Sequence, residues 1–193
     1  MFEKIEKWSK ELKTVDYKLL SSYQEGFLGK KVFEVTLANG DKKICERLTK
    51  KGDNGDAVVI LPITKEGKFL LEVQSRPNVT EASGVSLEFP AGMVDPNEDP
   101  KVSAIRELRE ETGYEPEDIK LMEWHHQDQG CSSAIIRLYL ATGCEKKYDV
   151  NLGKNEEIEA LEIDYEDVVQ LIKDNKITDS GSKLAFLMYE FLK

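Results

Sequence analysis

The chain has 193 residues, of which 40% are apolar and 33% charged, as in an ordinary globular protein. This length suits one domain with its own core, with room for a small additional unit. The net charge of −10 argues against nucleic acid or an anionic membrane as the main partner.

The cysteines and the amino terminus indicate the compartment. Cys45, Cys131 and Cys144 are odd in number and far apart, so the sequence indicates neither a disulfide framework nor a zinc site. The first residues lack the apolar run of a signal peptide, and no stretch reaches transmembrane length. We therefore expect a protein of the reducing cytoplasm.

Residues 1–54 are expected to form a separate N-terminal unit. Apolar side chains recur there at helical spacing, which predicts a short amphipathic helix. These side chains are Phe2, Ile5, Trp8 and Leu12. Two β-type runs, 32–37 and 43–48, flank Asn39-Gly40, a pair typical of a type I′ hairpin turn. The sequence thus predicts a helix followed by a small antiparallel β unit.

Residues 55–193 are expected to form the main domain. Buried-type apolar runs bounded by turn residues predict its strands. They lie at 57–63, 69–74, 119–124, 133–141 and 158–163. Two helices are expected near the end of the chain, one after Asp164 and one over 183–192. Strands mixed with helices predict an α/β fold with a mixed sheet between helices.

One helix is predicted over residues 100–112. Asp99 suits its N-cap, Pro100 its first position and Gly113 its C-terminal cap. Three carboxylates share one face of this helix, and three apolar residues lie on the opposite face, where a core would contact them. The carboxylates are Glu107, Glu110 and Glu111, and the apolar residues are Val102, Ile105 and Leu108. Crowded carboxylates repel unless cations lie between them, a pattern typical of Mg²⁺ sites in phosphate chemistry.

The segment from Gly92 to Gly113 reads Gly-x5-Glu-x7-Arg-Glu-Leu-x-Glu-Glu-x-Gly, and it resembles the signature of the Nudix hydrolases. The specified residues are Gly92, Glu98, Arg106, Glu107, Leu108, Glu110, Glu111 and Gly113. A solvated acidic face would explain three clustered glutamates, but not the whole pattern. Tyr114 departs from the aliphatic residue that the family more often carries. The resemblance implies an α/β/α sandwich and hydrolysis of nucleoside diphosphates linked to another group.

The resemblance also implies which residues bind metal. Glu107 and Glu111 would be ligands of Mg²⁺, with Mn²⁺ as the alternative ion. Glu110 would be a ligand or a neighbour of the ligands, and the backbone carbonyl of Ala91 a further ligand. Arg106 stands four residues before Glu110, so an ion pair along the helix would orient that carboxylate.

The general base in similar enzymes is an acidic residue on a loop before the last strand. Here that loop holds Asn155, Glu156 and Glu157. Glu156 matches the family position best, and Glu157 remains the alternative. An ordinary solvated acidic loop would look the same.

Several features resemble the ADP-ribose and ADP-sugar pyrophosphatase branch of the family. An N-terminal β unit forms a swapped homodimer in that branch, and it lends residues to the neighbouring active site. Arg76, and Arg47 from the swapped unit, would contact the diphosphate. Glu88 and Met93 would line the substrate pocket. The expected reaction converts ADP-ribose to AMP and ribose 5-phosphate.

One departure leaves the substrate open. The branch usually carries a proline in the turn after the motif, whereas residues 127–132 read Gln-Asp-Gln-Gly-Cys-Ser. UDP- and GDP-sugars are therefore alternatives to ADP-ribose. A Nudix-fold sensor that binds such ligands without turnover is the alternative from another class. The sequence does not settle the number of metal ions or whether the dimer is swapped.

Overall fold

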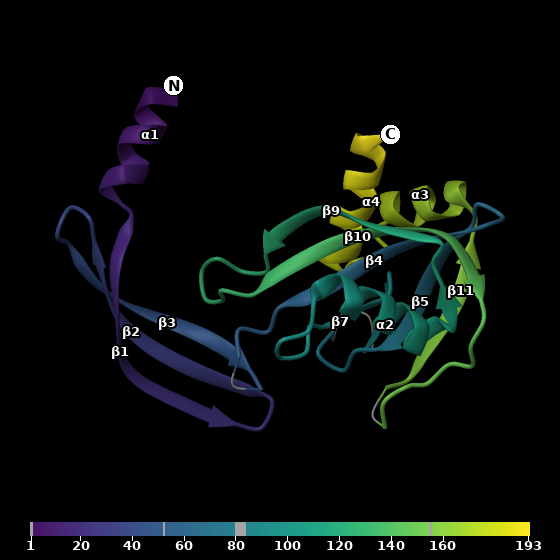
Figure 1. Ribbon diagram of the computed structural model, residues 1–193, viewed down its shortest axis with the longest axis horizontal. Coiled ribbons are helices and arrows are strands. Elements are labelled where there is room, and N and C mark those ends of the chain that lie inside the picture. The colour runs from purple at the N-terminus through teal and green to yellow at the C-terminus, as the bar shows by residue number, and fades with distance from the viewer. Residues whose placement is uncertain (1, 52, 80–83, 155) are drawn as a thin grey trace. The chain divides into compact units, whose positions relative to one another are not determined.

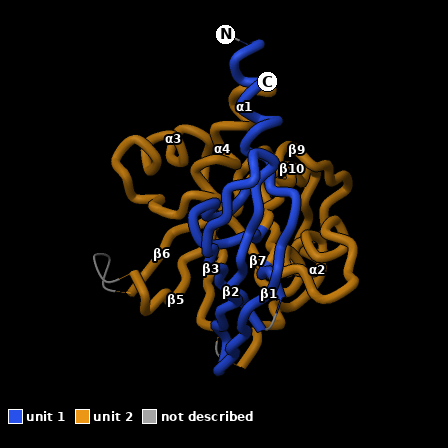
Figure 2. Tube along the Cα trace, turned by 90° about the vertical axis from the view of Figure 1, so that its left-hand side faces the viewer, with its two compact units in different colours: residues 1–55, 126–134 blue, residues 56–125, 135–193 orange. Residues whose placement is uncertain are grey.

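The computed structural model describes residues 2–51, 53–79, 84–154 and 156–193. The chain divides into two compact units, coloured separately in Figure 2. Unit 1 comprises residues 1–55 and 126–134, and unit 2 comprises residues 56–125 and 135–193. The sequence placed the second segment of unit 1 in the main domain. The assignment of 1–54 as a dimerisation element stays a prediction.

Unit 1 consists of a helix and a three-stranded antiparallel sheet with the order β1-β2-β3. Its elements are α1 (Phe2–Glu11), β1 (Thr14–Glu25), β2 (Leu28–Leu37) and β3 (Lys42–Lys50). Segment 126–134 joins this unit at β3, where the Leu48 N–H donates to the Cys131 carbonyl at 2.8 Å. The predicted helix and hairpin are therefore present, and β1 is a strand that the sequence reading did not resolve.

The turn between β2 and β3 is not of type I′, as the sequence predicted. That type requires positive φ at both central residues. Gly40 has φ 92°, but Asn39 is not among the non-glycine residues with positive φ. The Gly40 N–H donates to the Leu37 carbonyl at 2.9 Å, and the Leu37 N–H donates to that of Asp41. These bonds define a three-residue loop that ends in a left-handed glycine.

Unit 2 is built on a mixed sheet. Its strands are β4 (Ala57–Thr64), β5 (Phe69–Ser75), β6 (Val85–Glu88), β7 (Ala91–Met93), β8 (Tyr114–Glu115), β9 (Asp118–His126), β10 (Ile135–Lys146) and β11 (Ile158–Ile163). The central order is β11-β5-β4-β10-β8, with β6 beside β5, β7 beside β4 and β9 beside β10. Strands β4 and β10 are parallel, whereas β5 is antiparallel to β4, β6 and β11.

Three helices cover the two faces of this sheet. Figure 1 shows α2 (Pro100–Thr112) on one side and α3 (Tyr165–Lys173) and α4 (Ser180–Leu192) on the other. Alternate residues of β4 enter two separate cores, because successive strand side chains point to opposite faces. Val59 and Leu61 pack with Phe186 of α4, and Val58 packs with Leu108 of α2. The predicted α/β/α sandwich is confirmed.

Helix α2 has the bounds and caps that the sequence predicted. The Asp99 side chain accepts a hydrogen bond from the Lys101 N–H at 2.8 Å, and Pro100 is the first helical residue. Gly113 is left-handed at φ 79°, and its N–H donates to the Arg109 carbonyl at 2.9 Å. Both ends of the helix are therefore fixed by local chemistry.

The buried face of α2 differs from the predicted one. Val102 is 54% exposed, so it is not part of the core. The buried residues of the helix are Ser103, Ala104, Leu108, Glu111 and Thr112. The sheet thus covers Glu111 along with Leu108. The face of α2 that carries the carboxylates therefore overlaps the face that packs in the core.

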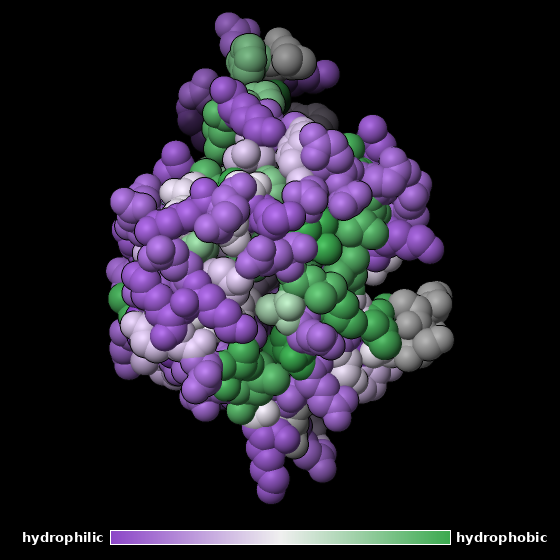
Figure 3. All heavy atoms as spheres, turned by 90° about the vertical axis from the view of Figure 1, so that its right-hand side faces the viewer, coloured by the Kyte–Doolittle hydropathy of each residue, from purple (hydrophilic) through white to green (hydrophobic). Residues whose placement is uncertain are grey.

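The surface mixes polar and apolar areas. Figure 3 shows one face on which hydrophilic residues predominate and hydrophobic residues gather in patches. In the described part of the chain, no helix is long and apolar enough to cross a membrane.

Candidate active site

The three carboxylates of α2 differ in their exposure to solvent. Glu111 is buried, and its carboxylate accepts a hydrogen bond from the Ala91 N–H at 3.1 Å. The side chains of Glu107 and Glu110 are 14% and 39% exposed. The helix thus presents a row of carboxylates that runs from the protein interior to the solvent.

Strand β7 passes very close to this row. A β-carbon on Gly92 would lie 2.0 Å from Cδ of Glu107, far inside contact distance. A side chain at this position would force the Glu107 carboxylate to move away from β7. The first glycine of the motif is therefore explained by this close approach of backbone to side chain.

Arg106 holds several groups of the motif together. Its guanidinium donates to Glu98 at 2.9 Å, to Glu107 at 2.7 Å and to Glu110 at 3.3 Å. It also donates to the Met93 carbonyl at 3.2 Å. The predicted pairing of Arg106 with Glu110 is therefore present. The hydrogen bonds from Arg106 are the main reason why the pKa of Glu98 is lowered to about 2.

Burial dominates the electrostatics of Glu107. Desolvation raises its pKa, and the hydrogen bond and charge of Arg106 partly oppose that rise. The neighbouring charges of Glu110 and Glu156 raise the pKa further. Such a carboxylate stays ionised more readily when a further cation approaches it.

A fourth carboxylate, which the sequence reading missed, contacts this row. Glu72 lies in β5 and is only 1% exposed, and its side chain is within hydrogen-bonding reach of Glu111. Burial raises the pKa of both groups, the charge of Glu88 raises that of Glu72 further, and the charge of Glu72 raises that of Glu111. An ionisable residue inside the apolar run 69–73 was the available signal, because such residues are rarely buried without a partner.

Glu88 and Arg76 form an ion pair next to Glu72. Glu88 stands opposite Glu72 across β5 and β6, and its carboxylate accepts from Nε of Arg76 at 2.8 Å. Burial raises the pKa of Glu88, and the Arg76 hydrogen bond opposes that rise. The Arg76 side chain is 44% exposed, so it remains accessible from solvent. The roles of both residues in substrate binding stay predictions.

The loop before β11 approaches the same carboxylates. The charge of Glu156 acts on both Glu107 and Glu111, and its carboxylate accepts from the Gly153 N–H at 2.6 Å. Glu157 instead begins the pairing with β5, where its carbonyl accepts from the Ser75 N–H at 3.1 Å. Asn155 lies outside the described residues. The charge of Glu156 thus acts on carboxylates of α2, and the backbone of Glu157 is bonded to β5.

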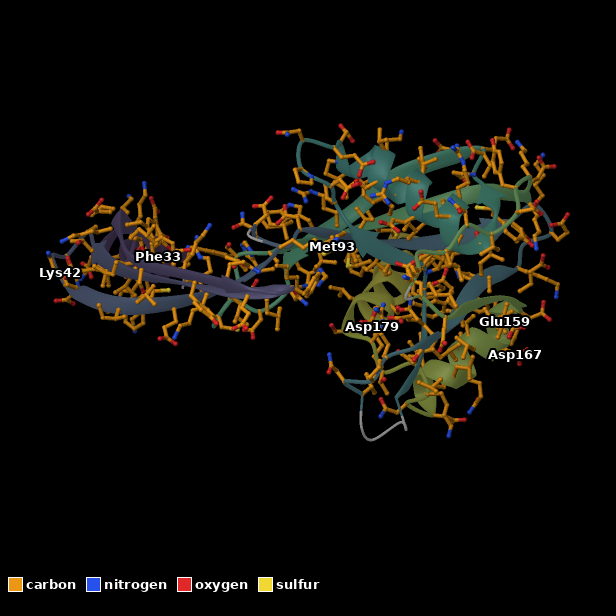
Figure 4. The ribbon with its side chains drawn as sticks, turned by 90° about the horizontal axis from the view of Figure 1, so that it is seen from below. Phe33, Lys42, Met93, Glu159, Asp167 and Asp179 are labelled. Carbon is orange, nitrogen blue, oxygen red and sulfur yellow. The ribbon has the colours of Figure 1, made fainter. Side chains whose placement is uncertain are left out.

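The two other predicted substrate residues belong to different units of the chain. Arg47 is in β3 of unit 1, where its guanidinium carbon lies 4.9 Å from the ring centre of Phe33 and 5.7 Å from that of Tyr17. Met93 ends β7 in unit 2, and Figure 4 shows it well apart from Glu159 of β11. Their contacts with substrate stay predictions.

A cavity of about 360 Å³ adjoins the carboxylates on the side of β11. Leu70, Glu111, Thr112, Tyr114, Lys146, Val150, Ile158, Glu159, Ala160 and Glu162 line it. Glu111 therefore contacts both the carboxylate row and an open space next to α2.

The described side chains contain no ready-made group of three or more His, Cys, Asp or Glu residues in metal-binding geometry. Arg106 pairs with Glu107 and Glu110, and the buried carboxyls of Glu72 and Glu111 lie beside them. One oxygen of Glu72 is buried and lacks a hydrogen-bond partner. Hard carboxylate oxygens in repulsive contact fit a divalent cation such as Mg²⁺.

Comparison with known proteins supports the assignment of the chain to the Nudix family. The NUDIX domain model matches residues 53–183. A methanol dehydrogenase activator of Bacillus methanolicus is 34% identical over 155 residues, 80% of each chain. An ADP-ribose pyrophosphatase of Bacillus subtilis is 29% identical over 157 residues, again 80% of each chain. A crystal structure of an ADP compounds hydrolase matches the fold with TM-score 0.74 at 17% identity, covering 94% of each chain.

The fold and the motif define a phosphoanhydride hydrolase of the α/β/α sandwich class. The chain belongs to the NUDIX domain family and is a Nudix-type pyrophosphohydrolase.

Proposed function

We propose that this chain hydrolyses the diphosphate bond of a nucleoside diphosphate sugar with the aid of Mg²⁺, and that ADP-ribose is its substrate. Water attacks one phosphorus, the bridging P–O bond breaks, and the products are AMP and ribose 5-phosphate. The observation that carries this proposal is the contact of Gly92 with Glu107 beside the buried Glu111.

The divalent cation would be held by carboxylates of α2. Glu107 and Glu111 are the proposed ligands, with the carbonyl of Ala91, and Glu110 is a ligand or lies next to them. Mg²⁺, or Mn²⁺ in its place, would neutralise phosphate oxygens and polarise the bond that breaks. Arg106 keeps Glu107 and Glu110 in fixed positions by pairing with both.

The proton of the attacking water needs an acceptor near the carboxylates. Glu156 is the proposed base, because its charge acts on Glu107 and Glu111 while the Glu157 carbonyl is bonded to β5. The proton passes from the water to the Glu156 carboxylate. Arg76, paired with Glu88, and Arg47 are proposed to bind the diphosphate oxygens.

The choice of ADP-ribose rests on the similarity to the Bacillus subtilis ADP-ribose pyrophosphatase. UDP- and GDP-sugars are the alternative substrates, since segment 127–132 lacks the proline of the branch. The Bacillus methanolicus relative is named as an activator, which favours a second candidate function. In that case the chain binds such a nucleotide and regulates a partner.

We also propose a homodimer formed through unit 1 in the cytoplasm. Helix α1 has no buried residue, and its apolar side chains Phe2, Ile5 and Trp8 are exposed. The three cysteines are free thiols, as a reducing compartment favours. Sedimentation analysis of the chain and of a variant with polar residues at these three positions tests the dimer, which the variant should dissociate.

The main test is product analysis. Wild-type protein, Glu111→Gln and the control Glu166→Gln are incubated with ADP-ribose and Mg²⁺, and the products are separated by chromatography. Glu166 is an exposed residue in the first turn of α3, so its change removes the same charge away from the site. We expect AMP from the wild type and the control, but not from Glu111→Gln or after chelation of the metal.

Other outcomes distinguish the alternatives. AMP formation by Glu111→Gln at the wild-type rate contradicts the metal assignment. Absence of AMP with any protein moves the test to UDP- and GDP-sugars. Binding of ADP-ribose by calorimetry without turnover of any of these substrates supports the regulatory function.

A further inference from the structure

Glu72 is a buried carboxylate that the Nudix motif does not include. It is only 1% exposed, and its Oε1 atom has no hydrogen-bond partner. Gln74, two residues further along β5, also has a buried side-chain oxygen without a partner. Buried acceptors without donors are costly, and an ion or a water molecule often explains them.

The orientation of Glu72 follows from its place in the strand. Leu70 packs in the same core as Leu108 of α2, and residues two apart in a strand share a face. Glu72 therefore faces α2, where its side chain lies within hydrogen-bonding reach of Glu111. The Glu72 side chain is thus on the side of the strand that faces the carboxylate row.

The protein itself supplies little positive charge to this side chain. Glu88 stands opposite Glu72 across the sheet, and the charge of Glu107 also acts on it. Arg76 is the nearby cation, but its Nε is already hydrogen bonded to Glu88. Arg106 pairs with residues of the motif instead. In the described structure, Arg76 therefore acts on Glu72 by its charge, but it is shared with the hydrogen-bonded Glu88.

We propose that Oε1 of Glu72 is an additional oxygen ligand of the divalent cation bound by Glu111. This inference rests on the proposed function, because it requires that a cation binds at α2. It accounts for a carboxylate in a buried strand, for the unpartnered oxygen and for the contact with Glu111. Carboxylate oxygens are the ligands that Mg²⁺ and Mn²⁺ prefer. The competing explanation is a proton shared between Glu72 and Glu111 with no role for metal.

The test measures Mn²⁺ binding by titration calorimetry without substrate. We expect Glu72→Gln to bind Mn²⁺ about 10–100-fold more weakly than wild-type protein. Glu166→Gln, which removes an exposed charge from α3, should bind it with unchanged affinity. Both side chains would hold the same ion. The fold-decrease in Mn²⁺ affinity of the double variant of Glu72 and Glu111 should therefore be smaller than the product of the fold-decreases of the two single variants.

A second readout separates a ligand from a structural side chain. Melting temperatures are measured in chelator and in excess Mn²⁺ for wild type and Glu72→Gln. We expect the variant to melt at or above the wild-type temperature in chelator, because a buried charge has been removed. The increase produced by Mn²⁺ should be smaller than in the wild type. A lower melting temperature in chelator with an unchanged Mn²⁺ increase would assign Glu72 a structural role and overturn the proposal.

The two proposals fail in different ways. Wild-type Mn²⁺ affinity in Glu72→Gln, together with AMP formation by the wild type, rejects the role of Glu72 alone. Weakened Mn²⁺ binding without hydrolysis of ADP-ribose rejects the substrate alone. If Glu72→Gln does not fold, Mn²⁺ binding is measured with Glu72→Asp instead. This variant keeps the charge, but its shorter side chain moves the carboxylate oxygens away from the ion. Wild-type affinity in that variant also overturns the proposal.

Discussion

The backbone at Gly92 and the carboxylate of Glu107 are in such close contact that a methyl group would not fit between them. A β-carbon on Gly92 would lie within 2.0–2.5 Å of three atoms of the Glu107 carboxylate. The backbone of Gly92 does not have positive φ, so the requirement for glycine comes from space rather than from backbone strain. This contact sets the distance between β7 and the acidic face of α2.

Substituting Gly92 by alanine should displace Glu107 and damage the site. We expect hydrolysis to fall at least tenfold and the free energy of unfolding to fall by about 1–3 kcal/mol, as for other overpacked positions. Gly130→Ala is the control, because a β-carbon there meets only the Asp128 carboxylate oxygen, at 3.1 Å. Urea unfolding and steady-state kinetics measure both quantities. Equal losses of activity and of unfolding free energy in the two variants would contradict the steric explanation for Gly92.

Arg106 should be needed as arginine and not merely as a cation. Its planar fork donates to Glu98, Glu107 and Glu110, which a lysine ammonium cannot do together. We expect Arg106→Lys to lower the free energy of unfolding by about 2–3 kcal/mol, since charged hydrogen bonds are lost. Urea denaturation at pH 7 in chelator measures this loss without any contribution from metal.

Arg109 on the same helix provides the matched control. It forms one ion pair, with Glu115 at 2.8 Å, and its side chain is more exposed than that of Arg106. Arg109→Lys should cost less than about 1 kcal/mol. A larger loss in this control than in Arg106→Lys would show that the network around Arg106 does not stabilise the fold.

Because of the ion pair of Glu98 and Arg106, the free energy of unfolding should depend on pH in the acid range. Folding lowers the pKa of Glu98 from its ordinary value of 4.5 to about 2. A group with a lowered pKa stabilises the fold above its unfolded pKa, and this contribution is lost as pH falls from about 4.5 towards 2. The contribution should be about 1–2 kcal/mol, because the carboxylate is partly solvated.

Comparing wild type with Glu98→Gln across pH isolates this contribution. The difference in free energy of unfolding between the two proteins should be largest at pH 6–7 and should shrink by pH 3. Urea denaturation at each pH measures it. A difference that stays constant from pH 7 to pH 3 would mean that Glu98 does not titrate with folding.

Local signals in the sequence were sufficient to predict the helix that carries the site. Asp99, Pro100 and Gly113 act on the backbone within a few residues, so the bounds of α2 were predicted correctly. The prediction of which face of the helix is buried was wrong, since Val102 is exposed while Glu111 is buried. Which side of a helix is covered depends on strands distant in the sequence, and apolar spacing alone does not report that contact.

The same limit explains why Glu72 was missed. Glu72 and Glu111 are separated by 39 positions, and only the packing of α2 on the sheet brings them together. The turn at Asn39-Gly40 shows a smaller failure of the same kind. The dipeptide marks a hairpin, but the register of β2 and β3 selects a three-residue loop instead of the two-residue type.

The last prediction concerns which glutamate of the loop before β11 accepts the proton. Both residues carry the same charge, but the charge of Glu156 acts on Glu107 and Glu111, whereas the Glu157 carbonyl is bonded to β5. We expect Glu156→Gln to lower kcat by about 10²–10⁴-fold, as the loss of a general base does. Glu157→Gln should retain kcat within about threefold, since its carboxylate has no such role.

Steady-state kinetics with the hydrolysed substrate and saturating Mg²⁺ compare the two variants. Glu156→Gln should keep the KM of the wild type, because the base acts on water and not on the bound nucleotide. Mn²⁺ affinity should fall far less in either variant than in Glu111→Gln, which separates the loss of a base from the loss of a metal ligand. A large fall in kcat in Glu157→Gln, with Glu156→Gln unaffected, would transfer the role of base to Glu157.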